Sequence, residues 1–487
     1  MREHRNHTVW LETRKDGAAV RIPVQVPAGT TVLQAMIAAG LRADAPCGGK
    51  GTCGKCRVQL DGQEVLACQT VVDRDLTVQV PQARDLKILT GGEAAAVQPD
   101  GTDAYVLAVD VGTTTVAACL LDGLSGRVLA EASCANPQSK FGADVISRIE
   151  YALGAGTDAL QACIGQALEQ LAAEAAEQAG ILPEAITAAA IVGNTAMHHL
   201  LLGIDPRPLV TPPYMPAVRD AMELDRNCRV RILPNIAGFV GGDTVGCMTA
   251  CGFDHLEELT LLIDIGTNGE MVLADQTRRI ACSTAAGPAF EGAKISCGMR
   301  GAAGAVDRVW LEDGAVRYHV LGETAPVGLC GSGLLDLVAA LLDLGVLDDT
   351  GYLEGGAYEL CDHVVLTQKD VREVQLAKAA IRAGIELMAE KMGAEVAQIR
   401  KVCLAGAFGN YMNPASACRI GMIPPVLESR IVPVGNAACE GAKRCALSAA
   451  EFARSRKLAA DTEFLELAGM PQFQDSYVDV LAFEEDG

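Results

Sequence analysis

Four cysteines near the start of the chain constrain its fold more than any other feature. Cys47, Cys53, Cys56 and Cys68 are separated by five, two and eleven residues. This spacing is a close variant of the C-x4-C-x2-C…C pattern of plant-type [2Fe–2S] sites. Three of the thiolates must converge, so the backbone between them has to wrap around an inorganic core. The spacing therefore predicts a [2Fe–2S] cluster with these four cysteines as ligands.

The segment between the cysteines is rich in glycine, which supports this interpretation. Gly48, Gly49, Gly51 and Gly54 permit unusual φ angles and a close approach of the backbone. Their amides can point at the sulfurs and stabilise the charge that reduction adds. A structural zinc site is the alternative, because C-x2-C spacing also suits zinc. A glycine-rich spacer of five residues favours the cluster.

The residues around the cysteines predict a small β-grasp domain. Two strands are expected over residues 8–26, around the turn Lys15-Asp16-Gly17, because Asp-Gly favours a hairpin turn. A helix is expected over residues 31–39. Further strands are expected over residues 56–60, 64–68 and 76–80. Two hairpins and one helix in this order are typical of a β-grasp.

A second pattern occurs twice in the remainder of the chain. Residues 105–122 contain an apolar strand, a tight turn after Asp110 and a second apolar strand. Residues 260–275 repeat this arrangement around Asp264. One D-x-G-T motif would mean little, but two copies in the same context predict a duplicated domain.

The repeated loops have the chemistry of a phosphate site. A glycine hairpin exposes amides and threonine hydroxyls to phosphate oxygens. An aspartate at the strand end can hold the hydrated Mg²⁺ that accompanies them, so Asp110 and Asp264 are candidate catalytic residues. The candidate ligand-binding residues of the two loops are Gly112, Thr113, Thr114, Thr115, Gly266, Thr267, Asn268 and Gly269.

Two further segments are expected at the same site. Asp243 lies at a predicted helix start and is either a simple N-cap or a catalytic base, since the sugar-kinase fold places its base in a similar D-T-V-G context. Residues 402–410 predict a buried strand that ends in a glycine turn, where the backbone can approach a flat adenosine ring. The candidate residues there are Gly406, Ala407 and Gly409.

Together these segments resemble the acetate-kinase/sugar-kinase/Hsp70/actin superfamily of ATP-binding domains. The resemblance implies an α/β and α+β multidomain protein, in which a β-grasp ferredoxin domain precedes a duplicated actin-like (ribonuclease-H-like) ATPase core. The expected divisions are a ferredoxin-like domain, a linker and the two halves of the ATPase core, at residues 1–82, 83–103, 104–255 and 256–487.

An iron–sulfur domain fused to this core is uncommon, and the whole chain resembles the reductive activators of corrinoid-dependent enzymes. The stretches that match are CGGKGTCGKC (47–56), DVGTTT (110–115), IVGNTAMHHL (191–200), GFVGGDTVG (238–246), LLIDIGTNGE (261–270), GLCGSGLLDL (328–337) and CLAGAFGN (403–410). The resemblance implies an ATP-hydrolysing enzyme that passes one electron to a Co(II) corrinoid protein and restores Co(I) for methyl transfer. The implied cofactors are one [2Fe–2S] cluster, ATP and Mg²⁺.

Charge and hydropathy limit the classes of partner that the chain can bind. Asp and Glu outnumber Lys and Arg by 61 to 40, and the formal charge of -21 argues against a nucleic-acid partner. The sequence shows no secretory signal and no apolar run long enough for a membrane span, so we expect a cytoplasmic protein. The resemblance implies two partners, a Co(II) corrinoid protein and a low-potential donor (ferredoxin or flavoprotein), and it leaves a homodimer open.

Two other functions remain open at this point. An activator of a 2-hydroxyacyl-CoA dehydratase would share the ATPase fold, and Cys247 and Cys251, four apart on an expected helix, could hold a metal with a partner subunit. A small-molecule kinase with a redox-sensing domain would use Asp243 as its base. The β-grasp cluster argues against the first and is unexplained by the second. His198 and His199 are either polar residues at a helix start or a cobalt ligand.

Overall fold

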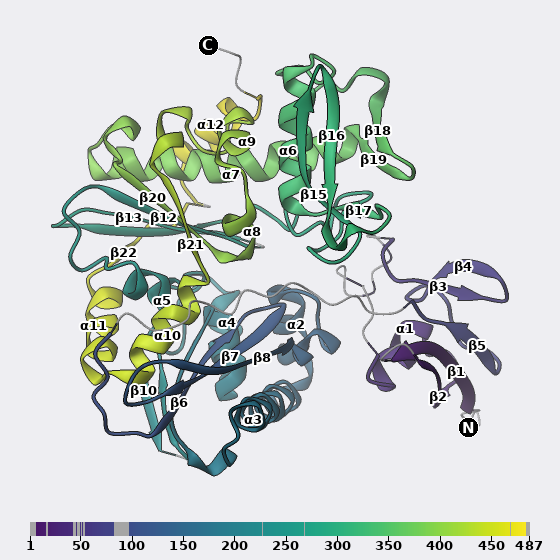
Figure 1. Cartoon of the computed structure of the whole chain (residues 1–487), viewed down its shortest axis with the longest axis horizontal. Helices are drawn as coiled ribbons and strands as arrows, with labels where there is room; N and C mark the ends of the chain where they lie inside the picture. Colours follow the sequence, from purple (N-terminus) through teal and green to yellow (C-terminus); the bar gives the residue numbers. More distant parts are fainter. Residues whose placement is uncertain are drawn as a thin grey trace. The chain divides into compact units, whose positions relative to one another are not determined.

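The computed structural model describes residues 6–15, 18–41, 45, 49, 51, 54–81, 97–225, 227–266, 268–467 and 469–483. The chain divides into two compact units. The first consists of residues 1–85 and 138–148, and the second of residues 86–137 and 149–487 (Figure 1).

The first unit contains a five-stranded sheet with the strand order β2-β1-β5-β3-β4. Strand β1 runs antiparallel to β2 and parallel to β5. The elements are β1 (Asn6–Lys15), β2 (Ala18–Pro27), α1 (Val32–Ala38), β3 (Arg57–Leu60), β4 (Gln63–Leu66) and β5 (Leu76–Gln79). The predicted pair of hairpins with one helix is confirmed, although Asp16 and Gly17 of the first turn lie outside the described residues.

Local chemistry explains two features of this unit. Thr31 and Gln34 form a capping box at the start of α1, in which each side chain accepts from the backbone of the other. Asp61 and Gly62, between β3 and β4, have φ angles of 52° and 76°. A two-residue hairpin turn of this type needs both residues in the left-handed region, which Asp-Gly tolerates best.

The second unit is built around two six-stranded sheets. The first has the order β10-β11-β9-β6-β7-β8 and the second β21-β20-β12-β13-β14-β22. The strands of the first sheet are β6 (Tyr105–Val111), β7 (Thr115–Asp122), β8 (Val128–Ala135), β9 (Ile186–Gly193), β10 (Met222–Asp225) and β11 (Arg229–Ile232). Those of the second are β12 (Thr260–Ile265), β13 (Gly269–Ala274), β14 (Arg279–Thr284), β20 (Lys401–Ala405), β21 (Ile431–Gly435) and β22 (Glu463–Phe464).

Five strands of each sheet share one topology, and the sixth differs, β10 beside β11 in the first sheet and β22 beside β14 in the second. In each, three consecutive strands form an antiparallel meander, β6-β7-β8 and β12-β13-β14. A later strand then pairs in parallel with the first strand of the meander, β9 with β6 and β20 with β12. A further strand extends each sheet in parallel, β11 and β21. The duplication that the repeated loops predict is confirmed.

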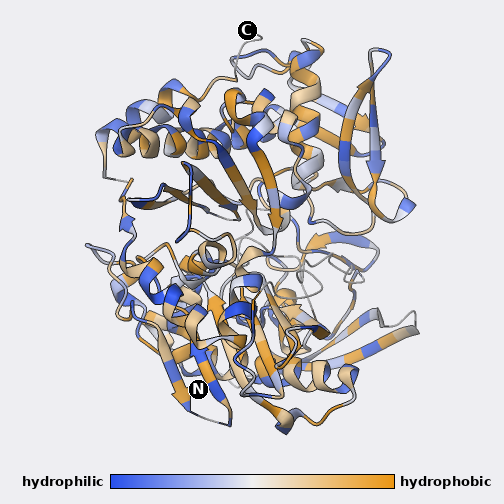
Figure 2. Cartoon of the chain, turned by 60° about the vertical axis from the view of Figure 1, so that its left-hand side comes forward, coloured by the Kyte–Doolittle hydropathy of each residue, from blue (hydrophilic) through white to orange (hydrophobic). Residues whose placement is uncertain are grey.

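Helices and two small sheets complete the chain, and Figure 2 shows that the helices carry both polar and apolar residues while the central strands are mostly apolar. The helices are α2 (Val145–Ala155), α3 (Asp158–Ala179), α4 (Thr195–Leu202), α5 (Gly242–Ala250), α6 (Gly331–Asp343), α7 (Gln368–Met392), α8 (Gly406–Tyr411), α9 (Pro414–Arg419), α10 (Ala437–Leu447), α11 (Ala449–Ala460) and α12 (Pro471–Asp479). The small sheets contain β15 (Ala305–Glu312), β16 (Ala315–Val320) and β17 (Gly328–Leu329), and β18 (Ala357–Cys361) and β19 (Val364–Thr367). Among the described helices, none is long and apolar enough to cross a membrane.

Helices α5 and α10 join the two sheets of the second unit. A single buried cluster contains Ala108 of the first sheet, Leu262 of the second, and side chains of both helices. The helices cross at two glycines. A Cβ atom on Gly441 would lie 2.1 Å from the carbonyl oxygen of Gly246, so only glycine permits this approach.

The end of the expected linker is held against α11. Asp100 accepts hydrogen bonds from the Ser448 hydroxyl at 3.1 Å and from the Ala449 backbone N–H at 2.7 Å. These contacts satisfy donors at the start of α11, as an N-cap does. Residues 83–96 of the expected linker lie outside the described residues.

Candidate functional site

The structure brings the three predicted catalytic aspartates together from three elements. Asp110 is on β6, Asp264 is on β12, and Asp243 is in the first turn of α5. Burial, followed by repulsion from Asp243 and Asp264, raises the pKa of Asp110 to about 7. Burial and repulsion from Asp243 likewise raise the pKa of Asp264 to about 7, and burial raises that of Asp243 to about 6. The three carboxyl groups therefore lie within electrostatic range of one another.

A fourth carboxyl group, which the sequence reasoning missed, belongs to the same cluster. Glu270 on β13 lies directly opposite Asp264 in the β12–β13 register. Burial, then repulsion from Asp243 and Asp264, raises its pKa well above the ordinary value. The sequence contained a signal for Glu270, because a tight hairpin after Asp264 places a residue of the following strand directly beside Asp264. In the first sheet the corresponding partner of Asp110 is Ala117, which carries no charge.

Asp243 is not the N-cap of α5, so that alternative is wrong. The cap is Gly241, and Asp243 is the second residue of the helix. Its carboxylate accepts a hydrogen bond from the backbone N–H of Thr244 at 2.8 Å. A Cβ atom on Gly241 would lie 2.6 Å from the Cα of Asn194, so the helix start is pressed against the end of β9.

The first phosphate loop is a tight hairpin braced by two asparagines. The backbone N–H of Gly112 donates to the Thr115 carbonyl at 2.9 Å. Asn136 donates from Nδ2 to the Gly112 carbonyl, and Asn194 donates from Nδ2 to the Thr113 hydroxyl, both at 2.8 Å. These contacts orient the loop before any ligand arrives.

The second loop has a similar closure. The backbone N–H of Gly266 donates to the Asn268 carbonyl at 2.8 Å. Gly269 begins β13, and a Cβ atom there would lie 2.9 Å from the Thr284 hydroxyl oxygen. Thr267 lies outside the described residues.

The predicted glycine turn after β20 is instead the start of a helix, α8. Gly406 has a φ of 82°, and a Cβ atom on it would lie 2.6 Å from Oδ1 of Asp264. The backbone therefore passes directly beside this carboxylate, which only glycine allows. Gly409 packs against Leu404, and nothing is described of the side chain of Ala407.

The carboxyl groups suit a hydrated cation rather than a bare one. Within the described ranges no set of three His, Cys, Asp or Glu side chains is arranged to hold a metal ion directly. Mg²⁺ keeps several of its waters in proteins, and carboxylates at a somewhat greater separation can bind those waters. Four acidic side chains with raised pKa values gain most from such a positive charge.

Two of the four predicted cluster ligands are described, and both are buried in the first unit. Cys56 precedes β3 and Cys68 follows β4, with exposures of 3% and 6%. The backbone N–H of Ala67 donates to the Cys56 carbonyl at 2.8 Å, which holds the two segments side by side. Cys47 and Cys53 lie outside the described residues.

The glycines of the cysteine loop fit a cluster at this position. Gly49, Gly51 and Gly54 all have φ angles in the left-handed region, at 83°, 78° and 66°. A Cβ atom on Gly51 would lie 2.6 Å from the Gln69 side chain, and one on Gly49 would lie 3.7 Å from Cβ of Cys68. The loop therefore passes close to the cysteine at the end of β4. Buried thiols beside a backbone of this kind are a suitable donor set for [2Fe–2S].

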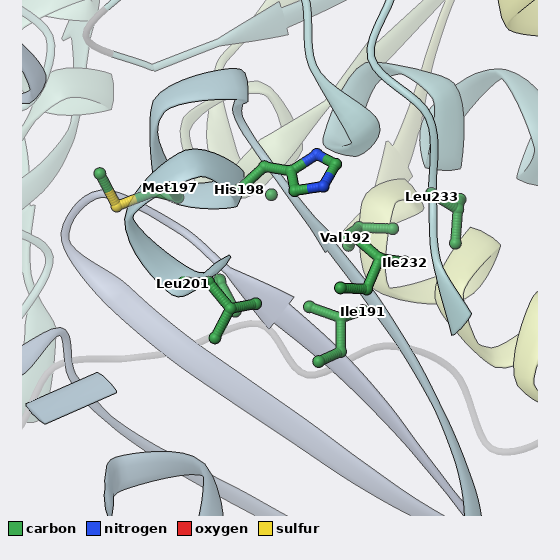
Figure 3. A pocket seen from close by; sticks show the side chains of 9 residues that line it. Ile191, Val192, Met197, His198, Leu201, Ile232 and Leu233 are labelled. Carbon is green, nitrogen blue, oxygen red and sulfur yellow. The ribbon is translucent and has the colours of Figure 1, made fainter. Parts of the chain in front are cut away.

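The two histidines of α4 are buried and make ordinary polar contacts. His199 Nδ1 lies 2.7 Å from the Thr195 carbonyl, and its Nε2 accepts from the Ala217 backbone N–H at 3.1 Å. His198 Nδ1 lies 2.6 Å from Nδ2 of Asn235, and burial lowers its pKa to about 4. Figure 3 shows its ring beside a small cavity lined mainly by apolar side chains of β9, α4 and β11. These surroundings favour the interpretation as neutral polar residues of a helix start.

Cys247 of α5 and Cys251, the C-cap residue of the same helix, have different neighbours. Cys247 is fully buried, and its thiol lies 3.8 Å from Oδ2 of Asp264. Cys251 instead lies within electrostatic range of Cys403 of β20. Both contacts are within the chain, so this arrangement does not favour a metal shared between subunits.

Three family models match the chain and together cover most of it. A model described as a 2Fe-2S iron-sulfur cluster binding domain matches residues 16–76, which include all four predicted ligand cysteines. A model described as the RACo middle region matches residues 105–256. A third, described as the C-terminal domain of RACo, the ASKHA domain, matches residues 258–487. The two repeated loops fall in the second and third matches.

Two relatives and one solved structure are similar over long stretches. The corrinoid activation enzyme RamQ of Eubacterium limosum is 34% identical over 414 residues, which is 77% of this chain and 69% of RamQ. The Co(II) methylated amine-specific corrinoid protein reductase of Methanosarcina barkeri is 29% identical over 287 residues, or 54% of this chain and 53% of that reductase. A solved reductive activator for corrinoid, iron-sulfur protein is 28% identical, with a TM-score of 0.71 over 98% of both chains.

Proposed function

We propose, since this chain belongs to the family of reductive activators of corrinoid proteins, that it is an ATP-hydrolysing enzyme that transfers one electron to a corrinoid protein in the Co(II) state. The transfer restores Co(I), the nucleophile needed for methyl transfer. One observation carries the proposal, the presence of a [2Fe–2S] domain and a two-part ATPase core in one chain. When bound, the cluster supplies a one-electron carrier.

The four cysteines Cys47, Cys53, Cys56 and Cys68 hold the cluster in this proposal. The burial of Cys56 and Cys68 supports it, because a dry surrounding protects thiolate ligands from exchange. The backbone bond from Ala67 to Cys56 also supports it, since it keeps these two ligands on adjacent segments.

In this proposal the second unit binds ATP, and residues of the second unit position the nucleotide for hydrolysis. The loops after β6 and β12 bind the phosphates through amides and hydroxyls. Asp110 and Asp264 would hold hydrated Mg²⁺ and orient the attacking water, and Asp243 would accept a proton from that water. The raised pKa values of these groups support the assignment, because perturbed carboxyl groups are frequent at functional sites. Adenosine lies against the backbone at Gly406, Ala407 and Gly409.

ATP supplies the free energy for electron transfer. This is needed because an axial ligand stabilises Co(II) and makes its reduction to Co(I) unfavourable. A protein shifts such an equilibrium only by binding one state more tightly than the other. Nucleotide binding between the two sheets, which meet through α5 and α10, would change the surface offered to the partner. The activator therefore favours the Co(II) partner over the methylated one, since only the former needs reduction.

Several finer features belong to the same proposal. The chain is divided into a ferredoxin-like domain (1–82), a linker (83–103) and two ATPase halves (104–255 and 256–487). A low-potential ferredoxin or flavoprotein delivers the electron, and the activator acts in the cytoplasm. The family leaves room for a homodimer.

The test is the visible spectrum of a Co(II) corrinoid protein mixed with this chain and a low-potential reductant. We expect rapid appearance of Co(I) only when ATP and Mg²⁺ are both present. Asp110→Ala and Asp264→Ala should each abolish this reaction and ATP hydrolysis, while iron content stays at two per chain. Equal Co(I) formation with and without ATP would make the protein a simple electron carrier and overturn the proposal. Four iron atoms per dimer in a [4Fe–4S] cluster would favour a dehydratase activator instead.

A further inference from the structure

Asn436, at the junction between β21 and α10, makes two contacts with one side chain. Its Oδ1 accepts the backbone N–H of Cys439 at 3.0 Å and so caps α10. Its side chain also hydrogen bonds the carboxylate of Asp110. This hydrogen bond lowers the pKa of Asp110, so it favours the ionised carboxylate, which can only accept, and the donor is therefore Nδ2 of Asn436. One amide therefore joins a helix start to a carboxylate of the nucleotide site.

This contact connects the two halves of the second unit. Asn436 follows the edge strand of the second sheet, whereas Asp110 is the penultimate residue of β6 in the first sheet. Helix α10 packs on β6, so its start lies near the loop after Asp110. Two further contacts fix the helix in place, the crossing of Gly246 with Gly441 and the approach of the Cys119 and Cys439 sulfurs to 3.5 Å.

The electrostatic surroundings of Asp110 give this contact its importance. Asp243 and Asp264 repel the carboxylate, and burial removes water that would otherwise stabilise its charge. Asn436 supplies a hydrogen bond that acts in the opposite direction. The start of α10 adds the positive end of a helix dipole on the same side. Without Asn436 the carboxylate would lose a hydrogen bond that opposes this repulsion.

We propose that Asn436 is a positioning residue for nucleotide hydrolysis, which holds Asp110 in the orientation that binds hydrated Mg²⁺. The inference rests on the proposed function. It adds that helix α10, which belongs to the second half by sequence, orients the carboxylate that the first half contributes to the cation site. A shift in the position of α10 therefore changes the affinity of the site for Mg²⁺-nucleotide.

The informative variant is Asn436→Ser, because serine caps a helix about as well as asparagine but is too short to donate to Asp110 at the same time. We expect the maximal rate of ATP hydrolysis to fall by about tenfold to a hundredfold, the cost of a misplaced catalytic group. The Mg²⁺ concentration for half-maximal rate should rise, whereas the affinity for ADP in EDTA should stay the same. If Asn436 only stabilised the fold, its loss would not weaken the Mg²⁺ dependence of hydrolysis while leaving the affinity for ADP in EDTA unchanged.

The chain offers a closely matched control in Asn413. Asn413 caps α9 through Oδ1, and its side chain also lies close enough to another carboxylate, that of Asp336, to lower the pKa of that group. Asn413→Ser should therefore lose the same kinds of contact and leave the Mg²⁺ dependence of hydrolysis at the parent's value.

Two measurements separate this inference from the proposed function. Thermal unfolding with Mg²⁺-ADP and with ADP in EDTA reports cation binding without any hydrolysis or corrinoid partner. We expect the additional stabilisation by Mg²⁺ to be lost in Asn436→Ser and kept in Asn413→Ser. A parent that binds Mg²⁺-ADP but reduces no corrinoid protein would contradict only the proposed function. An Asn436→Ser variant with the parent's Mg²⁺ response and hydrolysis rate would overturn the positioning role.

Discussion

Asp264 on β12 and Glu270 on β13 lie directly opposite each other in an antiparallel register, with Asp243 within electrostatic range of both. Like charges in this arrangement destabilise a sheet. The first sheet avoids the cost, because Asp110 faces Ala117. The second loop therefore holds an excess of negative charge that a bound cation would offset. This asymmetry leads to the first two predictions.

Glu270→Gln should stabilise the cation-free protein and impair its ATP hydrolysis. The substitution removes one buried ionisable carboxyl group without changing the size of the side chain, so above the raised pKa of Glu270 the free energy of unfolding in EDTA should rise by up to about 1 kcal/mol. Hydrolysis should slow by about tenfold or more, because the site loses an acceptor for Mg²⁺-bound or attacking water. Glu312→Gln, in an exposed ion pair with Arg317, is the control and should change neither quantity. A destabilised Glu270→Gln variant with normal hydrolysis would contradict this account.

Stability without a cation should decrease as the pH rises through the range from about 6 to about 7. The folded-state pKa values of Asp110 and Asp264 are about 7 and that of Asp243 is about 6, all above the ordinary aspartate value. The folded state thus binds more protons than the unfolded state in this range, and raising the pH removes that advantage. Mg²⁺-ADP needs the ionised forms, so its stabilising effect should increase over the same range.

The measurement is thermal unfolding between about pH 5 and about pH 8, with and without Mg²⁺-ADP. The difference between the two curves should widen with rising pH. In a double variant, Asp110→Asn with Asp264→Asn, the unfolding temperature should depend less on pH, both with and without Mg²⁺-ADP. If the cation-free protein becomes more stable between about pH 6 and about pH 7 through these groups, the sign of the linkage is wrong.

Gly441→Ala should destabilise the second unit and reduce nucleotide hydrolysis. The new methyl group would lie 2.1 Å from the Gly246 carbonyl oxygen, so α5 and α10 would have to separate. Overpacking of this kind costs about 1–3 kcal/mol or more. Chemical denaturation gives the cost, and Gly165→Ala in α3 gives the comparison. Gly165 has no neighbour within 4 Å of its would-be Cβ atom, so alanine there should stabilise its helix by about 0.5–1 kcal/mol.

Cys56→Ser should remove the cluster and leave ATP hydrolysis nearly unchanged. Cys56 belongs to the core of the first unit, and the nucleotide site belongs to the second. Iron and sulfide content and the rhombic S = 1/2 signal of the reduced protein measure the loss. Cys228→Ser, in a partly exposed cysteine outside the loop, should leave all of them intact. Stoichiometric zinc in the parent protein would instead show that the cysteines form a structural metal site.

Local features of the chain could be predicted from the sequence because their causes are local. The cysteine spacing indicated a metal loop, and Asp61-Gly62 indicated a hairpin turn. The repeated loops at Asp110 and Asp264 indicated a duplication, which the matching strand orders confirm. Each of these patterns depends on residues close together in the chain, so no knowledge of distant neighbours was needed.

Other local predictions failed where packing competed with propensity. Asp243 was a reasonable N-cap by residue type, but Gly241 takes that position because the helix start presses against Asn194. Gly406 was expected in a turn, yet it begins α8 while its backbone passes beside Asp264. A glycine pattern alone does not distinguish a turn from a tightly packed helix start.

The remaining features were decided only by the tertiary structure. Cys119 and Cys439 are 320 residues apart in the chain and have sulfurs 3.5 Å apart. The bond from Asn436 to Asp110 and the crossing of Gly246 with Gly441 depend on the same placement of α10. Periodicity and spacing describe what a segment can form, but they do not specify which distant segment it will contact. Here burial of a shared apolar core between two sheets made that choice, and it placed the residues that surround the nucleotide site.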